Sequence, residues 1–79
     1  MNKKKQDEVV TITEDIDMLY KAVIKIYDTH RETQNQNFIV NIVMHNSKNC
    51  MKNLQLFAEI MQDFNIDLKI NTQIQLINT

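Results

Sequence analysis

The chain has 79 residues, a formal net charge of −1, one cysteine and neither glycine nor proline. Glycine supplies the positive φ of tight turns and phosphate loops, so its absence excludes Gly-rich phosphate cradles, dinucleotide-binding fingerprints and nucleophile elbows. The single cysteine, Cys50, excludes an internal disulfide, and the near-neutral charge argues against a general nucleic-acid binder.

The length is that of one small domain, whose core provides a thin margin of stability. With no disulfide and no cluster of metal ligands, oligomerisation is the remaining support, and we expect a homodimer or higher homo-oligomer. No segment approaches the roughly 18 apolar residues of a membrane span, and no apolar segment follows the N-terminal lysines as it does in a signal peptide. We therefore expect no membrane partner and a location in the cytoplasm of a bacterial host.

Residues 1–7 are polar and are expected to form a flexible basic tail, with residues 8–79 as a single α+β domain. Residues 8–13 are β-branched and alternate in character, which predicts a strand. Thr11 and Glu14 have the spacing of a capping box, and Thr13 is a second N-cap candidate. The first helix is therefore expected to begin near residue 13 or 14.

Apolar residues at alternating steps of four and three make this first helix the most strongly predicted element. One row consists of Ile12, Ile16, Leu19, Val23, Ile26 and His30. A second row beside it consists of Tyr20, Ile24 and Tyr27. So wide an apolar face fits a helix covered by a core on one side and a partner on the other, and equally a helix with both rows in one larger core.

A polar break at residues 31–37 follows, where Asn35 or Asn37 is expected to take a left-handed turn conformation. Residues 38–44 are apolar except for Asn41, and their β-branched composition favours a strand over a short helix. Ser47 is the expected N-cap of a second helix over residues 48–64, with Asn65 in place of a C-terminal glycine. Its apolar stripe is expected to be Cys50, Leu54, Phe57, Met61 and Phe64.

Residues 66–76 alternate strictly between apolar and polar, which predicts a strand with one solvated face. The segment is either one long strand or a hairpin with a loop at residues 71–73, and a single strand would offer a dimer a sheet edge to share. The expected order is strand, helix, strand, helix, then a C-terminal strand or hairpin. Both helices are expected to pack on one face of a small sheet.

Few residues of the chain could act in catalysis or bind a metal ion. His30 and His45 are the only histidines, and no set of ligands accompanies them. A cysteine on an apolar helical stripe, such as Cys50, is normally part of the core, and nothing marks an oxyanion hole beside it. We therefore expect no enzymatic activity, no catalytic residue, no metal site and no cofactor.

The remaining candidates point to a protein partner. Glu14, Asp15 and Asp17 form an acidic cluster that either complements the helix dipole or meets a basic partner surface. Tyr20 and Tyr27 extend this surface along the second apolar row. Asn, Ile and Lys, whose codons are A/T-rich, supply 10, 11 and 8 residues, a composition typical of phage or mobile-element proteins from AT-rich bacteria. We expect an inhibitor, anti-defence or regulatory protein that occupies a surface of a host or cognate protein.

An alternative comes from a resemblance over residues 5–46. The segment VVTITEDI at residues 9–16 resembles the strand-to-helix start of ribbon–helix–helix repressors, and NFIVNIV at residues 37–43 is similar to the start of their second helix. The resemblance implies a dimeric DNA-binding regulator. Its nucleic-acid contacts would be Thr11 and Thr13 in the groove and Lys3, Lys4 and Lys5 on phosphates.

Overall fold

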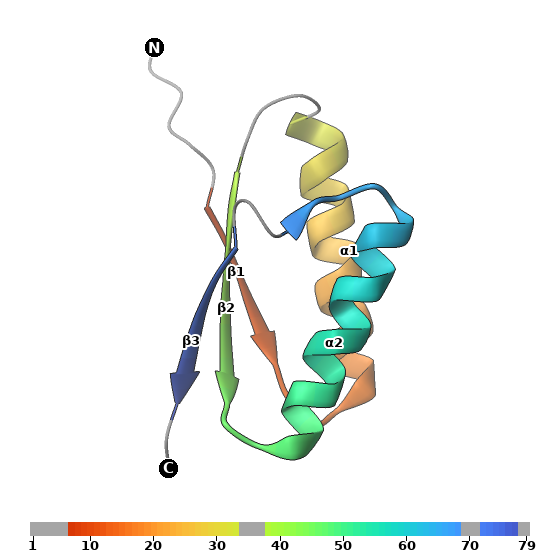
Figure 1. The fold of residues 1–79 in the computed structure, drawn as a ribbon. Helices are drawn as coiled ribbons and strands as arrows, with labels where there is room; N and C mark the ends of the chain where they lie inside the picture. Colours follow the sequence, from red (N-terminus) through yellow and green to blue (C-terminus); the bar gives the residue numbers. More distant parts are fainter. Residues whose placement is uncertain (1–6, 34–37, 69–71, 78–79) are drawn as a thin grey trace.

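The computed structural model describes residues 7–33, 38–68 and 72–77. They form strand β1 (Asp7–Ile12), helix α1 (Ile16–Thr33), strand β2 (Ile39–His45), helix α2 (Lys48–Asp63) and strand β3 (Thr72–Ile77) (Figure 1). The α+β fold and the order strand, helix, strand, helix, strand are confirmed. The segment at residues 38–44, for which a helix was the alternative, is largely strand β2.

The three strands form one parallel sheet in the order β1-β2-β3, with β2 in the centre. In the register, Val10 lies opposite Ile42, and Ile42 lies opposite Ile74. Both helices lie on the same face of the sheet, as Figure 1 shows. They pack against each other and against β1, whereas β3 has its extensive contacts with β2. The helical layer is therefore offset toward β1.

The core lies between this face and the helices. Along β2, Val40, Ile42 and Met44 are buried while their neighbours are partly exposed, because successive strand side chains point to opposite faces. The helix α1 contributes Leu19, Val23 and Ile26, its larger buried apolar side chains. The remaining buried apolar residues are Val10, Ile12, Ala22, Phe38, Cys50, Phe57, Met61 and Ile66.

The N-terminus of α1 is capped by a residue other than those expected. Asp15 precedes the helix; its carbonyl accepts from the amides of Met18 and Leu19, and its Oδ1 accepts from the Asp17 amide at 2.9 Å. The predicted capping box of Thr11 and Glu14 is wrong, because Thr11 is still in β1. The helix begins at Ile16, later than expected, and its C-terminus extends into the expected polar break as far as Thr33.

Both ends of α2 have the expected caps. The Ser47 hydroxyl accepts from the Cys50 amide at 3.2 Å, and Ser47 is in the extended conformation of an N-cap. Asn65 has φ 62° and so adopts the left-handed conformation usually given to glycine. The amide of Ile66 then donates to the Met61 carbonyl, which turns the chain away from the helix.

Removing the Ser47 hydroxyl should measurably destabilise the fold. We expect Ser47→Ala to lower the free energy of unfolding by about 1 kcal/mol, because a helix amide loses its acceptor. For a domain of this size, that corresponds to a fall of about 4–8 °C in melting temperature. Ser47→Asn is the matched control, since asparagine also caps helices and should retain most of the stability. Equal losses in the two variants would contradict the capping role.

Only part of the alternating C-terminal segment, residues 66–76, is a strand. Ile66 is buried and Leu68 is partly buried against the core, yet both lie in the connection that follows α2. The hairpin alternative is wrong, because β3 runs parallel to β2 and residues 66–68 pair with no strand. Residues 69–71 lie outside the described part, as do Asn35, Asn37 and most of the predicted tail.

Within the described ranges, no helix is both long enough and apolar enough to cross a membrane.

Candidate functional site

An exposed apolar surface runs along α1 and ends just past the C-terminus of α2. Tyr20, Ile24 and Tyr27 follow one another at steps of four and three and are 50%, 60% and 36% exposed. Phe64, just past α2, is 44% exposed, and its ring centroid lies 4.8 Å from that of Tyr27. We call Tyr20, Ile24, Tyr27 and Phe64 the α1 ridge. It places three aromatic rings and one aliphatic side chain in contact with solvent.

The α1 ridge is separate from the buried face of its helix. At 100° per residue, Tyr20, Ile24 and Tyr27 fall within about 60° of one another, on one flank of the row that Leu19, Val23 and Ile26 bury. The wide apolar face therefore divides into a core row and an exposed row. Of the two expectations for this face, the one that placed both rows in one larger core is wrong, because the second row is exposed.

A cation borders the Tyr27 end of the ridge. The guanidinium carbon of Arg31 lies 5.9 Å from the centroid of the Tyr27 ring, one turn further along α1. This distance is within the range of a cation–π interaction, which draws the charge toward the negative face of the ring. Arg31 thereby adds a charged donor beside the aromatic surface.

Phe64 belongs to the predicted apolar stripe of the second helix but is not buried with most of the other residues of that stripe. It lies on the same helical stripe as Phe57 and Met61, which are fully buried. The helix ends at Asp63, however, and Asn65 turns the chain. The Phe64 ring therefore lies outside the core, against Tyr27. The available signal was Asn65 itself, which marks the preceding residue as the last before a turn.

The structure does not bring the acidic candidates and both tyrosines into one cluster. Asp15 caps the helix, and the Glu14 carboxylate accepts a hydrogen bond from the Ser47 hydroxyl at 3.3 Å, so both carboxylates have local partners. Asp17 is exposed in the first turn, within one turn of Tyr20. At 1.5 Å per residue, Tyr27 lies about 15 Å further along the axis. The acids thus border only the N-terminal end of the ridge.

The residues proposed for DNA contact are placed differently from those of a ribbon–helix–helix protein. Thr11 is in β1, which pairs in parallel with β2 of the same chain. The Thr13 hydroxyl accepts from the Asp15 amide at 3.1 Å. Residues 3–5 lie outside the described part. Because Ile39–His45 is a strand where the family has its second helix, the fold implied by the resemblance is wrong.

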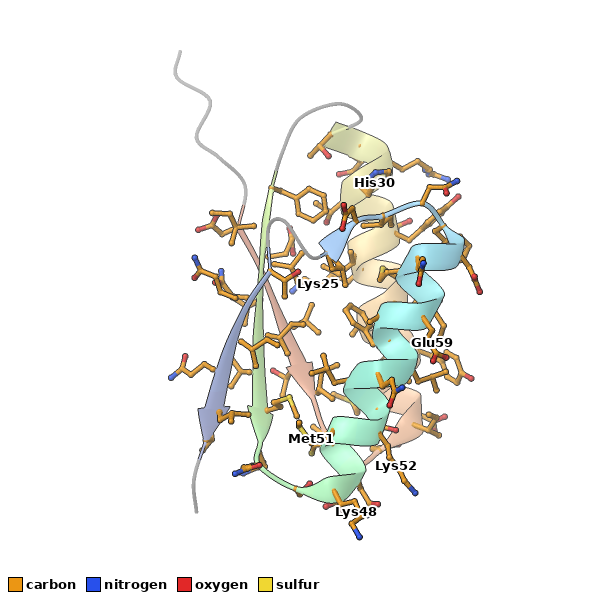
Figure 2. All side chains as sticks on the ribbon, viewed as in Figure 1. Lys25, His30, Lys48, Met51, Lys52 and Glu59 are labelled. Carbon is orange, nitrogen blue, oxygen red and sulfur yellow. The ribbon has the colours of Figure 1, made fainter. Side chains whose placement is uncertain are left out.

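The three most reactive side chains belong to different elements of the fold. Cys50 is only 1% exposed and belongs to the core. His30 lies near the end of α1 (Figure 2), with its ring centroid 6.4 Å from that of Phe38. His45 is exposed at the end of β2. In the part of the chain that the structure describes, no three His, Cys, Asp or Glu side chains are placed to hold a metal ion.

An open hollow of about 440 Å³ lies beside the last turns of α2 and the connection that follows. Its lining residues are Ala58, Gln62, Asn65, Ile66, Asp67 and Leu68. Among these described residues, two carboxamides and one carboxylate supply the polar side chains.

Comparison of the chain with protein-family models, with curated proteins and with solved structures gives no match.

Proposed function

We propose that this protein is a small non-catalytic binding module that occupies a surface of another protein through its α1 ridge. The observation that carries the proposal is the exposure of Tyr20, Ile24, Tyr27 and Phe64 on one continuous surface. Isolated apolar side chains are common on protein surfaces, but a contiguous apolar patch is typical of an interaction site. The chemistry of the ridge therefore supports a protein target.

The residues of the ridge are of the types that supply most of the binding energy at an interface. Tyrosine and arginine are enriched among the residues that dominate interface energetics. A tyrosine ring offers a large contact area with only two side-chain torsions to fix, so its ordering on binding costs little. The packing of Tyr27 against Phe64 at 4.8 Å already restricts both rings before a target arrives. This preorganisation lowers the entropic cost of binding.

The target class follows from the composition of the chain. An abundance of Asn, Ile and Lys supports an origin in a phage or mobile element of an AT-rich bacterium. Such a protein would act as an inhibitor, an anti-defence factor or a regulatory subunit on a host or cognate protein in the cytoplasm. It would act as a homodimer or higher homo-oligomer, since a small domain without disulfides gains stability by association.

The proposal is tested by affinity capture from the lysate of an AT-rich bacterium, after nuclease treatment and at moderate salt. We expect the wild type to retain a discrete protein and Ile24→Asp to lose it, because a charge at the centre of the ridge must be desolvated on binding. Met18→Asp is the matched control. Met18 is also an exposed apolar residue of α1, at 40%, but it lies about 120° around the helix from Ile24.

Each outcome of the capture has a clear meaning. Loss of the captured protein in Ile24→Asp, with retention in Met18→Asp, supports the ridge as the binding surface. Equal capture by all three proteins would contradict it. Recovery of DNA alone, lost as salt rises, would replace the proposal with a nucleic-acid-binding role, because phosphate contacts weaken steeply with salt. Circular dichroism of each variant shows whether it remains folded.

A further inference from the structure

We infer that the outer edge of β3 is the surface through which two copies of this chain associate, by antiparallel β3–β3 pairing into a continuous six-stranded sheet. The inference rests on the homodimer proposed above, and it is independent of the target that the α1 ridge binds. It is carried by a difference between the two edges of the sheet, by the uncovered side chains of β3, and by the self-complementarity of its sequence.

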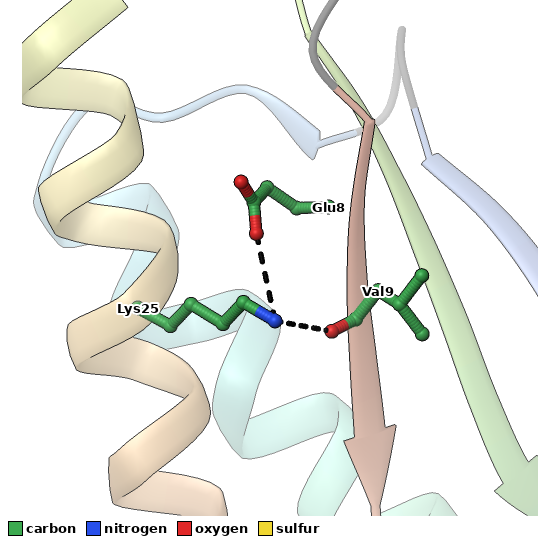
Figure 3. A network of polar contacts seen from close by, with 3 residues as sticks. All are labelled: Glu8, Val9 and Lys25. Carbon is green, nitrogen blue, oxygen red and sulfur yellow. Dashed lines mark hydrogen bonds and ion pairs between the residues drawn. The ribbon is translucent and has the colours of Figure 1, made fainter.

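The edge at β1 is occupied by the protein's own side chains. The ammonium group of Lys25, from α1, donates to the Val9 carbonyl at 3.0 Å and forms an ion pair with Glu8 at 3.5 Å (Figure 3). A backbone acceptor at this edge is thus already used, and charged side chains lie beside it. Lysine and other charges at an edge strand are a common defence against pairing with a further chain.

The edge at β3 has the opposite character. The strand sequence, TQIQLI, contains no charged residue and no proline, and a long neutral edge of this kind is a template for pairing. Its register places Ile74 beside Ile42 and Leu76 beside Met44, so both side chains point to the helix side of the sheet. They are nevertheless 53% and 46% exposed, because the helical layer is offset toward β1.

A second copy of the same strand fits this edge. In an antiparallel pair centred on Gln75, Ile74 lies opposite Leu76 of the partner subunit, and Leu76 lies opposite Ile74 of the partner subunit. A shift of two residues in either direction leaves one of the two apolar side chains opposite a polar residue. The centred register therefore gives the most favourable cross-strand pairs on the helix side. On the open side it places the two Gln75 side chains face to face.

The symmetry of this pairing also agrees with the fold. A twofold axis perpendicular to the sheet keeps the helices of both copies on the same side and makes the interface self-complementary. The α1 ridge lies on one flank of α1 and at the C-terminal end of α2, and none of its residues belongs to β3. The dimer therefore presents two ridges.

The test begins with sedimentation velocity over a range of protein concentrations. We expect a dimer in the wild type and a rise of at least about tenfold in its dissociation constant for the double variant Ile74→Lys/Leu76→Lys, because like charges then lie across the interface. Val9→Lys is the matched control, since Val9 has the same 53% exposure as Ile74 but lies on the other edge strand. It should leave the dimer unchanged.

A cysteine variant tests the register. We expect Gln75→Cys to form a covalent dimer on mild oxidation, because directly opposed residues of an antiparallel pair are close enough for a disulfide. Gln73→Cys should not, since in this register it faces Ile77 of the partner subunit. Cys50 does not compete, because it is buried. Cross-linking of Gln73→Cys but not of Gln75→Cys would overturn the register.

The remaining outcomes separate this inference from the proposed function. A wild type that stays monomeric at all concentrations would overturn the dimer while leaving target capture by the ridge intact. A dimer that survives Ile74→Lys/Leu76→Lys but not Val9→Lys would overturn the choice of edge. A monomer whose β3 pairs only when the captured target is added would show that a foreign strand, and not a second copy, is the occupant.

Discussion

Replacing Phe57 by alanine should remove about 3–5 kcal/mol from the free energy of unfolding, the largest loss expected from any single truncation in this protein. Phe57 is 0% exposed, and among the fully buried side chains it is the largest. Native stability scales at about 0.05–0.15 kcal/mol per residue, which gives about 4–12 kcal/mol for a chain of this length. The variant should therefore be partly or wholly unfolded at 37 °C.

Phe64→Ala is the matched control for this prediction. It removes the same ring from a site one helical turn beyond Met61 that is half-exposed and contacts Tyr27. We expect a loss of about 1 kcal/mol, since only an exposed aromatic pair is broken. Urea titrations followed by far-ultraviolet circular dichroism measure both variants. Similar midpoints would mean that the core does not lie where the structure places it.

The second large loss of stability is expected from a substitution on the buried face of α1. Ile26 is 0% exposed beneath the sheet, and Ile26→Ala should lower the free energy of unfolding by about 2–5 kcal/mol through lost burial and the cavity that remains. For a domain of this size, such a loss lowers the melting temperature by roughly 8 °C or more. Differential scanning calorimetry measures it directly.

Ile24→Ala makes the same chemical change two residues earlier in the same helix. Because Ile24 is 60% exposed, we expect a change within about 0.5 kcal/mol. The pair isolates burial from helix propensity, which is identical in the two substitutions. If Ile24→Ala proved as destabilising as Ile26→Ala, the α1 ridge would belong to the core and would be no binding surface.

The sequence predicted the elements whose local signals are strong. β-branched residues marked β1 and β2, and the steps of four and three marked both helices. Ser47 and Asn65 marked the ends of α2, because a hydroxyl acceptor and a left-handed residue are needed there whatever the tertiary structure. These signals depend on residues close together in the chain, so they can be recognised without knowledge of the fold.

Features that depend on distant residues were less predictable. The alternation from residue 66 looks like one strand, but Ile66 and Leu68 pack on the core from a connection, and β3 begins only at Thr72. Two parallel strands require a connection that returns the chain to the other end of the sheet. The first residues of the apparent strand belong to this connection between β2 and β3. The parallel order of the sheet was not predicted.

The candidate site was predicted in part for the same reason. Tyr20 and Tyr27 were identified from helical spacing, and the structure places both on the exposed α1 ridge. Phe64 was placed on the apolar stripe of the second helix by its spacing, but the exact end of the helix decides where its side chain points. Glu14 and Asp15 were identified as acidic. The hydrogen bond between Glu14 and Ser47 joins residues 33 positions apart and appears only in three dimensions, whereas the cap that Asp15 provides is local and was missed.

The two proposed surfaces are compatible in one assembly. Pairing through β3 leaves both α1 ridges of the dimer open to solvent on the helical side. A dimer with two identical binding surfaces gains avidity toward a target that is itself dimeric or repetitive, provided that the geometry allows both contacts. The Ile74→Lys/Leu76→Lys variant would then bind such a target more weakly, although its ridge is unchanged.

Site-specific photo-cross-linking reports which surface of the protein touches the target, and it is therefore the most direct test of the α1 ridge. A photoreactive amino acid is placed at position 24, in the ridge, or at position 18, outside it, and each protein is irradiated in nuclease-treated lysate. We expect one discrete cross-linked host protein from position 24 and none from position 18. Cross-linking to that protein from position 18 alone, or to the same set of proteins from both positions, would rule out the α1 ridge as the binding surface.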